Sequence, residues 1–177
     1  MLSLIAFVAM QAIPVNVLIV PGVKIGHVKL GQIVPAILGQ ATFADGAAGS
    51  IWSTWKAADG NTVDTFAQLN AAGSGHAVVY VRVTSASFKT ANHVCTGETW
   101  GAIKAHYPGV SIKTYHSKQF VRKLSIMDDK AKGISFEVTL NAAQQVTNHS
   151  KCLAIWVHSN GVAFNPSEWV IYEPISR

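Results

Sequence analysis

The sequence predicts a mainly β protein, an antiparallel β-sandwich or jelly roll of about eight strands with one or two short helices. The prediction depends first on the second half of the chain, where β-branched and aromatic runs are separated by Gly, Asn, Ser or Pro. It depends also on the perfect alternation of apolar and polar side chains in Ile134–Leu140, the pattern of a half-buried antiparallel strand. Helical periodicity is scarce.

The predicted strands are connected by sequences typical of tight turns. The first two are joined through Pro21 and Gly22, because proline presets one turn dihedral angle and glycine accepts the next. The polar sequence Asp128–Gly133 predicts a turn between two strands of a hairpin, with Asp128 and Asp129 solvated at its tip. The predicted strands cover residues 15–20, 23–30, 77–83, 110–115, 120–126, 134–140, 153–158 and 169–172.

Two short helices and a long loop complete the predicted elements. Residues 62–71 place apolar side chains at a spacing of three, and Thr62 can cap the first helical turn. Residues 99–106 predict a second short helix, which ends before Pro108. Between residues 39 and 60, Gly, Ala, Ser and Asp dominate without a clear period, which predicts a loop.

The chain is predicted to fold as one domain over residues 1–177, since no linker, repeat or low-complexity segment divides it. Residues 1–23 are uncharged and largely apolar, and the first charged side chain is Lys24. A signal peptide needs a basic region before its apolar segment, and a spanning helix would have to pass Pro14 and Pro21. We therefore expect these residues to pack in the domain's own core or to dock on a neighbouring chain, and membrane contact is the outcome least favoured.

The chain is short of charge. Charged residues make up 13% of the sequence and apolar residues 49%, whereas soluble domains typically contain about 25% charged residues. A monomer with so few charges cannot easily keep its surface free of apolar patches, so the composition favours burial of part of the exterior against other chains. The formal net charge of +5 suits a mild attraction to phosphate-bearing or acidic glycan surfaces.

Few residues are candidates for catalysis or metal binding. Among seven histidines, the spacing of His93, Cys95 and His106 resembles that of metal ligands, because side chains two apart on a strand point the same way, but a fourth ligand is missing. No nucleophile elbow, phosphate-binding loop or dinucleotide motif is present, and no cofactor is predicted. Cys95 and Cys152 are either two thiols or one disulfide.

Two groups of side chains are candidates for binding. Trp52 and Trp55 lie in the predicted loop, where an aromatic pair can anchor a glycan or a protein. Lys118, Arg122 and Lys123 are basic residues with aromatic residues nearby, a combination that can contact phosphates or glycans. Strand alternation sends these three side chains to mixed faces, so an ordinary solvated surface is the competing interpretation.

Three segments near the C-terminus carry a resemblance: the strands Lys132–Leu140 and Cys152–Asn160 and the tail Tyr172–Arg177. In pattern they resemble the end of the microvirus major spike proteins, members of the small jelly-roll coat and spike proteins of icosahedral viruses. The resemblance implies a non-enzymatic virion component that contacts copies of itself, other shell proteins or a host surface. A basic N-terminal arm for holding a genome is absent, which favours an external role.

The sequence therefore predicts a non-enzymatic structural subunit of a multimeric particle, most simply a virion capsid, spike or decoration protein located in the virion. The first alternative is a secreted or surface binding module, lectin-like, that uses Trp52 and Trp55. The second alternative is a small enzyme that depends on histidine or on a metal.

Overall fold

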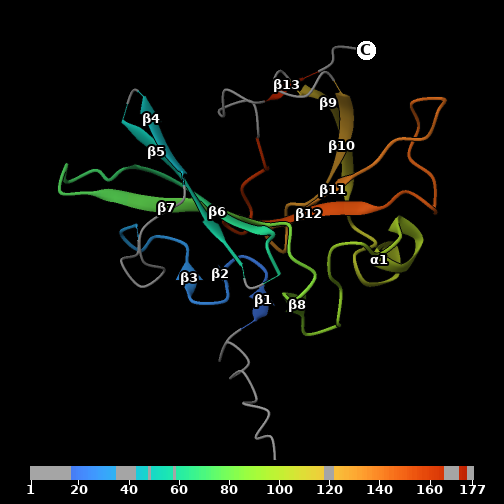
Figure 1. Ribbon diagram of the computed structural model, residues 1–177, viewed down its shortest axis with the longest axis horizontal. Helices are drawn as coiled ribbons and strands as arrows, with labels where there is room; N and C mark the ends of the chain where they lie inside the picture. The colour runs from blue at the N-terminus through green and yellow to red at the C-terminus, as the bar shows by residue number, and fades with distance from the viewer. Residues whose placement is uncertain are drawn as a thin grey trace, which may run out of the picture.

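The computed structural model describes residues 17–34, 43–47, 49–57, 59–117, 122–165 and 172–174, and Figure 1 shows their arrangement. These residues form thirteen strands and one helix, so the predicted mainly β class is confirmed. The elements are β1 (Leu18–Val20), β2 (Lys24–Ile25), β3 (Val28–Lys29), β4 (Phe43–Ala47), β5 (Ser50–Lys56), β6 (Thr62–Leu69), β7 (His76–Val83), β8 (Lys89–Thr90), α1 (Trp100–His106), β9 (Ser111–Ser117), β10 (Arg122–Asp129), β11 (Ile134–Val138), β12 (Cys152–Val157) and β13 (Tyr172–Pro174).

The strands form two sheets that stack as a sandwich. The small sheet has the order β3-β2-β1-β8, and the large sheet has the order β13-β9-β10-β11-β12-β7-β6-β5-β4. Within the large sheet, β4 to β7 and β9 to β12 are two antiparallel meanders, joined where β12 pairs with β7. The order follows the chain within each meander, whereas β13 returns after β12 to pair with β9 at the edge of the sheet. In Figure 1 the large sheet bends upward at both ends, and the small sheet and α1 lie beneath it.

The main core fills the space between the two sheets. Ile19, Ile25 and Val28 of the small sheet pack in one apolar cluster with side chains from the lower face of the large sheet, among them Val81 and Phe136. Burial of one such side chain contributes roughly 1.5 to 3 kcal/mol to the free energy of unfolding. The short strands of the small sheet are therefore held mainly by the side chains that they bury.

The upper face of the large sheet, which points away from the small sheet, carries a second apolar cluster: Phe66, Tyr80, Ile126, Trp156 and Phe164. As a result the central strand β11 is buried at every position. Strict alternation predicted a solvated face for Ser135 and Glu137, and this prediction is wrong because the upper face is covered as well.

Two predictions for residues 39–71 are also wrong. The predicted loop contains the β4–β5 hairpin, and the predicted helix at residues 62–71 is strand β6, which pairs on both sides with β5 and β7. A bulge between Phe66 and Ala67 shifts the register of β6. The apolar spacing of three in this segment therefore resembles that of a helix. The segment nevertheless forms a strand, because β5 and β7 supply its backbone hydrogen bonds from both sides.

Other local predictions are confirmed. Strands β10 and β11 form the predicted hairpin, with the turn at residues 130–133. Helix α1 begins at Trp100 and ends before Pro108. No helix in the described ranges has the length and apolar character needed to cross a membrane. The predicted strand at residues 23–30 is divided into β2 and β3 by a turn. Parts of the predicted strands 15–20, 120–126 and 169–172 fall on residues 1–16, 118–121 and 166–171, which lie outside the described residues.

Three turns meet at Gly133, the last residue of the turn between β10 and β11. The Gly22 amide of the β1–β2 turn donates a hydrogen bond to the Gly133 carbonyl oxygen (3.1 Å), and the His158 amide donates to the same oxygen (3.0 Å). Gly133 has a φ of 68°, and a Cβ atom there would overlap the His158 carbonyl oxygen and lie 2.8 Å from the Gly22 Cα atom. This contact holds the small sheet to the large one through backbone atoms.

We expect Gly133→Ala to lower the free energy of unfolding by about 3 kcal/mol, because it adds steric overlap to the strain of a left-handed backbone. Gly60→Ala is the matched control, since Gly60 has a φ of 80° and a Cβ atom there would meet no other atom within 4 Å. The control should cost only about 1 kcal/mol. Urea unfolding of both variants checks the difference, and equal losses would contradict the packing role of Gly133.

Candidate functional site

A group of charged side chains lies on the upper face of the large sheet, centred on Arg82 of β7. Its Nη1 atom donates a hydrogen bond to Asp64 Oδ2 of β6 (2.8 Å), and its Nε and Nη2 atoms donate to the two carboxylate oxygens of Glu137 of β11 (2.8 and 3.1 Å). The Glu137 side chain has no exposed area, and the Arg82 side chain is 15% exposed. The guanidinium thus bridges two carboxylates from distant parts of the chain.

The register of the sheet places these side chains on one face. Arg82 is the direct cross-strand partner of Asp64 on one side and of Trp156 on the other. Glu137 lies one strand further, opposite Ala154. Because cross-strand partners share a face, the four polar and aromatic side chains meet over strands β6, β7, β12 and β11.

Trp156 completes the coordination of Glu137. Its indole Nε1 atom donates to Glu137 Oε1 (2.6 Å), and the Arg82 guanidinium carbon lies 5.5 Å from the centre of the indole ring. Trp52 of β5 meets Trp156 edge to face, with the ring centres 6.2 Å apart. A cation over a tryptophan face is attracted by the ring quadrupole, so Trp156 stabilises the guanidinium in addition to the two carboxylates.

A second polar cluster, which we call the Asp128 cluster (Asp128, Ser135 and His158), lies in the same face. Ser135 Oγ donates to Asp128 Oδ1 (2.9 Å), and it lies 3.1 Å from His158 Nε2. His158 Nε2 is also 3.0 Å from Asp128 Oδ1. The backbone amide of Phe164 donates to Asp128 Oδ2 (3.0 Å), which ties the segment after β12 to the end of β10. Asp128 is therefore buried and fully engaged, contrary to the predicted solvated turn tip.

The environment of Asp128 lowers the pKa of its carboxyl group below the ordinary value of 3.8. Burial alone would raise this pKa, since it disfavours the charged form. The hydrogen bonds from His158, the Phe164 amide and Ser135 outweigh burial, because all of them favour the carboxylate. The cluster therefore depends on an ionised Asp128.

The Asp128 cluster contains the residue types of a hydrolase triad but not its geometry. In such a triad the serine and the acid contact different nitrogens of the histidine ring. Here both contact Nε2, while Nδ1 lies 3.2 Å from the carbonyl oxygen of Ser159. Ser135 and His158 are also fully buried. This geometry satisfies buried polar atoms, and it offers no exposed nucleophile.

Comparison with known proteins adds little to this geometry. No family model matches the chain, and no curated protein matches it. Among solved structures, the uncharacterized protein yfeY from Escherichia coli is similar over 78% of this chain and 97% of its own, with 13% identity and a TM-score of 0.43. The interpretation of the clusters therefore depends on the residues of this chain.

The two predicted loop tryptophans lie in strand β5, which corrects the interpretation of Trp52 and Trp55 as an exposed pair. Being three residues apart on a strand, they point to opposite faces. Trp55 is buried, whereas Trp52 is half-buried and donates from its indole Nε1 atom to Thr54 Oγ1 (2.9 Å). The pair therefore cannot form one stacking platform, because β5 sits inside the sheet and directs each ring to a separate layer.

The proposed metal ligands are not brought together as a metal site. In the described ranges, no group of three or more His, Cys, Asp or Glu side chains could hold a metal ion. The Cys95 thiol donates to Glu98 Oε1 (3.6 Å), and burial, assisted by the charge of Glu98, raises the pKa of Cys95. His93 and His106 are exposed. Cys95 and Cys152 are free thiols, and burial raises the pKa of Cys152 as well.

The predicted basic group cannot be assembled from the described residues. Lys118 lies outside them, and Arg122 and Lys123 are neighbours at the start of β10, where only the backbone is described. A basic patch at these three residues stays a prediction.

The charged group around Arg82 was not predicted from the sequence, although the sequence contains one signal for it. Arg82 is the single charged residue in the apolar run of residues 77–83. A lone charge inside a run that is otherwise alanine, valine and tyrosine indicates a buried partner of opposite sign, since an unpaired buried charge is very costly. Which acids provide that partner depends on strand order, and the sequence does not show it.

We expect Arg82→Met to lower the free energy of unfolding by about 3 to 5 kcal/mol, because it leaves two carboxylates buried without a counter-charge. Arg82→Lys is the matched control, since it keeps the charge but cannot contact both carboxylates with a planar fork. It should lose clearly less stability. Chemical unfolding followed by tryptophan fluorescence measures both variants, and an equal loss would show that the charge itself is unimportant.

Stability should fall in acid as Asp128 becomes protonated. The lowered pKa of Asp128 contributes stability that is fully present above the ordinary value of 3.8 and is lost as the pH falls through the lower value of the folded protein. Asp128→Asn should cost about 2 kcal/mol at neutral pH and should reduce the decline between about pH 5 and pH 2. Urea titrations across this range test it, and an unchanged acid slope in the variant would contradict the role of Asp128.

Proposed function

We propose that the chain is a non-enzymatic structural subunit of a multimeric particle, and that the particle is a virion in which it serves as a capsid, spike or decoration protein. The observation that carries the assembly part is a set of exposed aliphatic side chains where the β6–β7 hairpin ends. The virion part is supported by the resemblance of the C-terminal strands to viral coat and spike proteins.

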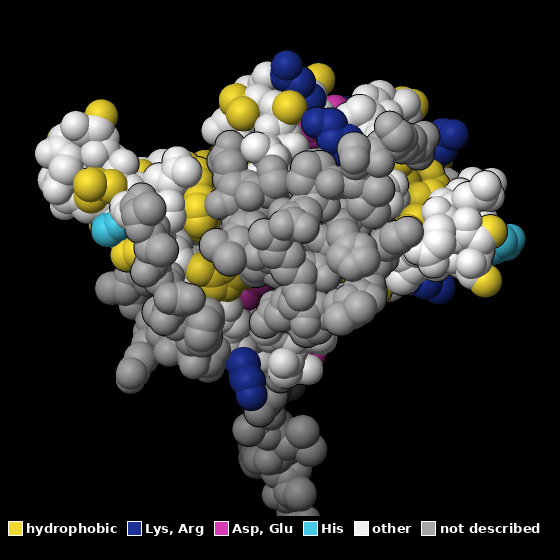
Figure 2. Space-filling view, turned by 90° about the horizontal axis from the view of Figure 1, so that it is seen from above, with side chains coloured by type: hydrophobic (Ala, Val, Ile, Leu, Met, Phe, Trp, Pro, Cys, Tyr) yellow, Lys and Arg dark blue, Asp and Glu magenta, His cyan; other side chains and the backbone are white. Residues whose placement is uncertain are grey.

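The hairpin end (Ile33, Leu69 and Gly75) protrudes from the sandwich. Leu69 is 50% exposed and Ile33 is 52% exposed. The two side chains lie at the same hairpin end but on opposite faces of the sheet, because Leu69 is the cross-strand partner of His76 and Ile33 pairs with the neighbouring Ala77. Figure 2 shows hydrophobic side chains on the lobe at the left, where the β6–β7 hairpin of Figure 1 ends. Burial of this surface against a neighbouring copy removes apolar area from water.

Sheet edges offer a second means of association. In the described part of the chain, β4 and β13 are the outer strands of the large sheet, and each pairs with a single neighbour. An outer strand presents unpaired backbone amides and carbonyls, to which a strand of another chain can be added. Both features suit a subunit that meets copies of itself.

The polar clusters support a scaffold role rather than catalysis. Arg82 binds Asp64 and Glu137, and the side chains of the Asp128 cluster bind one another, so each group stabilises strand register within the sheet. A lectin-like role loses the support of Trp52 and Trp55, because the two rings lie in different layers.

We expect the purified chain to associate as its concentration rises, with an average mass above that of the monomer by light scattering. Replacement of both Ile33 and Leu69 by lysine should lower the association constant at least tenfold, because it adds charge to a surface that must lose water on assembly.

Ile112→Lys is the control, since Ile112 is 53% exposed but lies on β9, away from the hairpin end. It should leave association nearly unchanged. A wild-type chain that stays monomeric at high concentration, with an unfolding midpoint independent of concentration, would overturn the proposal. An equal effect of Ile112→Lys would show that the hairpin end is not the contact.

A further inference from the structure

The outward face of the small sheet carries three lysines in a row. Ile19, Ile25, Val28 and Thr90 of this sheet are buried against the core. Neighbouring residues of a strand point to opposite faces, so the other positions point away from the protein. We call this surface the lysine face, and it consists of Leu18, Val20, Lys24, Lys29 and Lys89.

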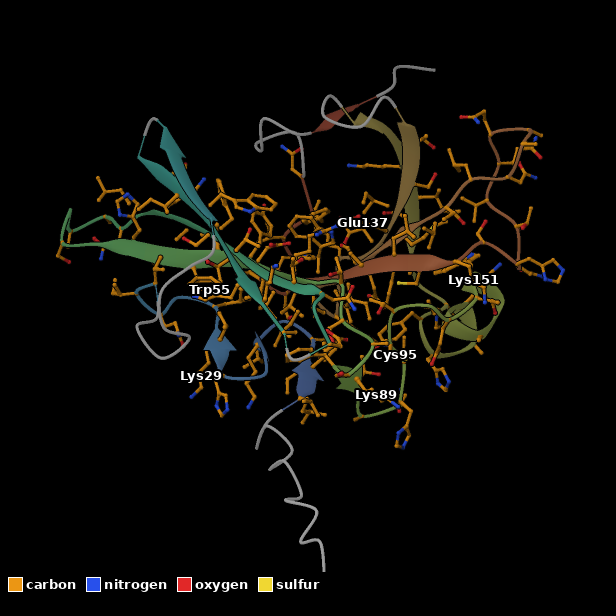
Figure 3. All side chains as sticks on the ribbon, viewed as in Figure 1. Lys29, Trp55, Lys89, Cys95, Glu137 and Lys151 are labelled. Carbon is orange, nitrogen blue, oxygen red and sulfur yellow. The ribbon has the colours of Figure 1, made fainter. Side chains whose placement is uncertain are left out.

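The register places two of the three lysines side by side and the third on the far edge strand of the same face. Lys24 of β2 is the direct cross-strand partner of Lys29 of β3. On the other side of β2 lies β1, and beyond it β8, where Lys89 is the partner of Leu18 of β1. With strands about 4.8 Å apart, the lysines extend over roughly 15 Å. Like charges placed directly opposite each other destabilise a sheet, and an anionic partner would remove this repulsion. Figure 3 shows Lys29 and Lys89 on the lower side of the molecule, far from Glu137.

Most acidic side chains described in the structure are engaged elsewhere. Asp64, Glu137 and Asp128 are buried in the upper face, and exposed Asp59 accepts a hydrogen bond from Ser85 (2.6 Å). Glu98 accepts the thiol hydrogen of Cys95 (3.6 Å), and the charges of Glu98 and Lys89 shift the pKa of that thiol in opposite directions. Strands β1, β2, β3 and β8 themselves contain no acid, so the lysine face is a cationic surface.

Exposed aliphatic side chains lie among these lysines. Leu18 is 42% exposed, and Val23, in the turn between β1 and β2, is 46% exposed. The sequence that leads into β1, residues 1–17, has no charged side chain. Cations around aliphatic side chains match a bilayer, whose anionic headgroups overlie its acyl chains. Single-stranded nucleic acid is bound by stacking on aromatic rings, whereas the outward positions here are Lys, Leu and Val.

We propose that the lysine face docks on an anionic lipid bilayer, with Lys24, Lys29 and Lys89 at the headgroup phosphates and Leu18 and Val23 at the boundary with the acyl chains. The proposal goes beyond the assembly role and uses a different surface. It also departs from the sequence-based expectation that membrane contact is least favoured. That expectation was drawn from the apolar sequence of residues 1–23, whereas the lysine face exists only once β1, β2, β3 and β8 have paired.

Vesicle co-sedimentation of the full chain tests the proposal. The chain should bind phosphatidylcholine vesicles that contain phosphatidylserine, should not bind pure phosphatidylcholine vesicles, and should dissociate as the salt concentration rises. Each lysine replaced by glutamine should lower the partition coefficient about fivefold, and Lys24→Glu should lower it about twenty-five-fold. Lys24→Glu places opposite charges across from each other at Lys29, so the fold is kept.

Lys113→Glu is the matched control, because it makes the same change of charge at an exposed lysine on β9. It should leave vesicle binding within about twofold, as should the double replacement at Ile33 and Leu69. Equal binding to neutral vesicles, or equal losses for Lys113→Glu and Lys24→Glu, would overturn the proposal. Lysine-dependent binding of single-stranded DNA without any binding of vesicles would overturn it in favour of a nucleic-acid partner.

Discussion

The large sheet depends on the bridge that Arg82 makes between Asp64 and Glu137. These residues come from β6, β7 and β11, so the bridge crosses the β7–β12 junction where the two meanders are joined. A shift of one residue in any of these strands would turn a charged side chain to the opposite face and leave its partner buried alone. Trp156 adds a hydrogen bond to the same carboxylate. The bridge therefore specifies strand register more than it adds net stability.

Burial of acidic side chains in the large sheet changes the balance of charge on the protein surface. Asp64, Asp128, Asp129 and Glu137 are buried, and together they are four of the nine acidic residues of the chain. The described surface is consequently more positive than the overall composition indicates, and its lysines have few acids beside them. The surface therefore has a cationic region, the lysine face, and an apolar region, the hairpin end. Each region suits a different partner.

Local sequence was sufficient to predict an element where the turn or stop signal lies within the same short segment. The β10–β11 hairpin has a polar turn between two β-branched runs, and α1 is ended by Pro108, so both were predictable. Strands β4, β5 and β6 were not, because Gly, Ala, Ser and Asp dominate around β4 and β5 without a clear period, and the bulge at Phe66 hides the alternation of β6. The successive pairings of β4 with β5, β5 with β6 and β6 with β7 decide the structure, and these pairings are not visible within a short window of sequence. For the same reason the sequence predicts a loop, and not a strand, at Trp52 and Trp55.

By itself the sequence determined the mainly β class, most of the strands in the second half and the shortage of charge. It also marked Arg82 as an isolated charge in an apolar strand. Only the tertiary structure decided which acids meet Arg82, that both faces of β11 are buried, and that Lys24 faces Lys29. The physical reason is that hydrophobic alternation acts along one strand, whereas ion pairs, buried polar clusters and the lysine face require strands that are neighbours only after the sheets have formed.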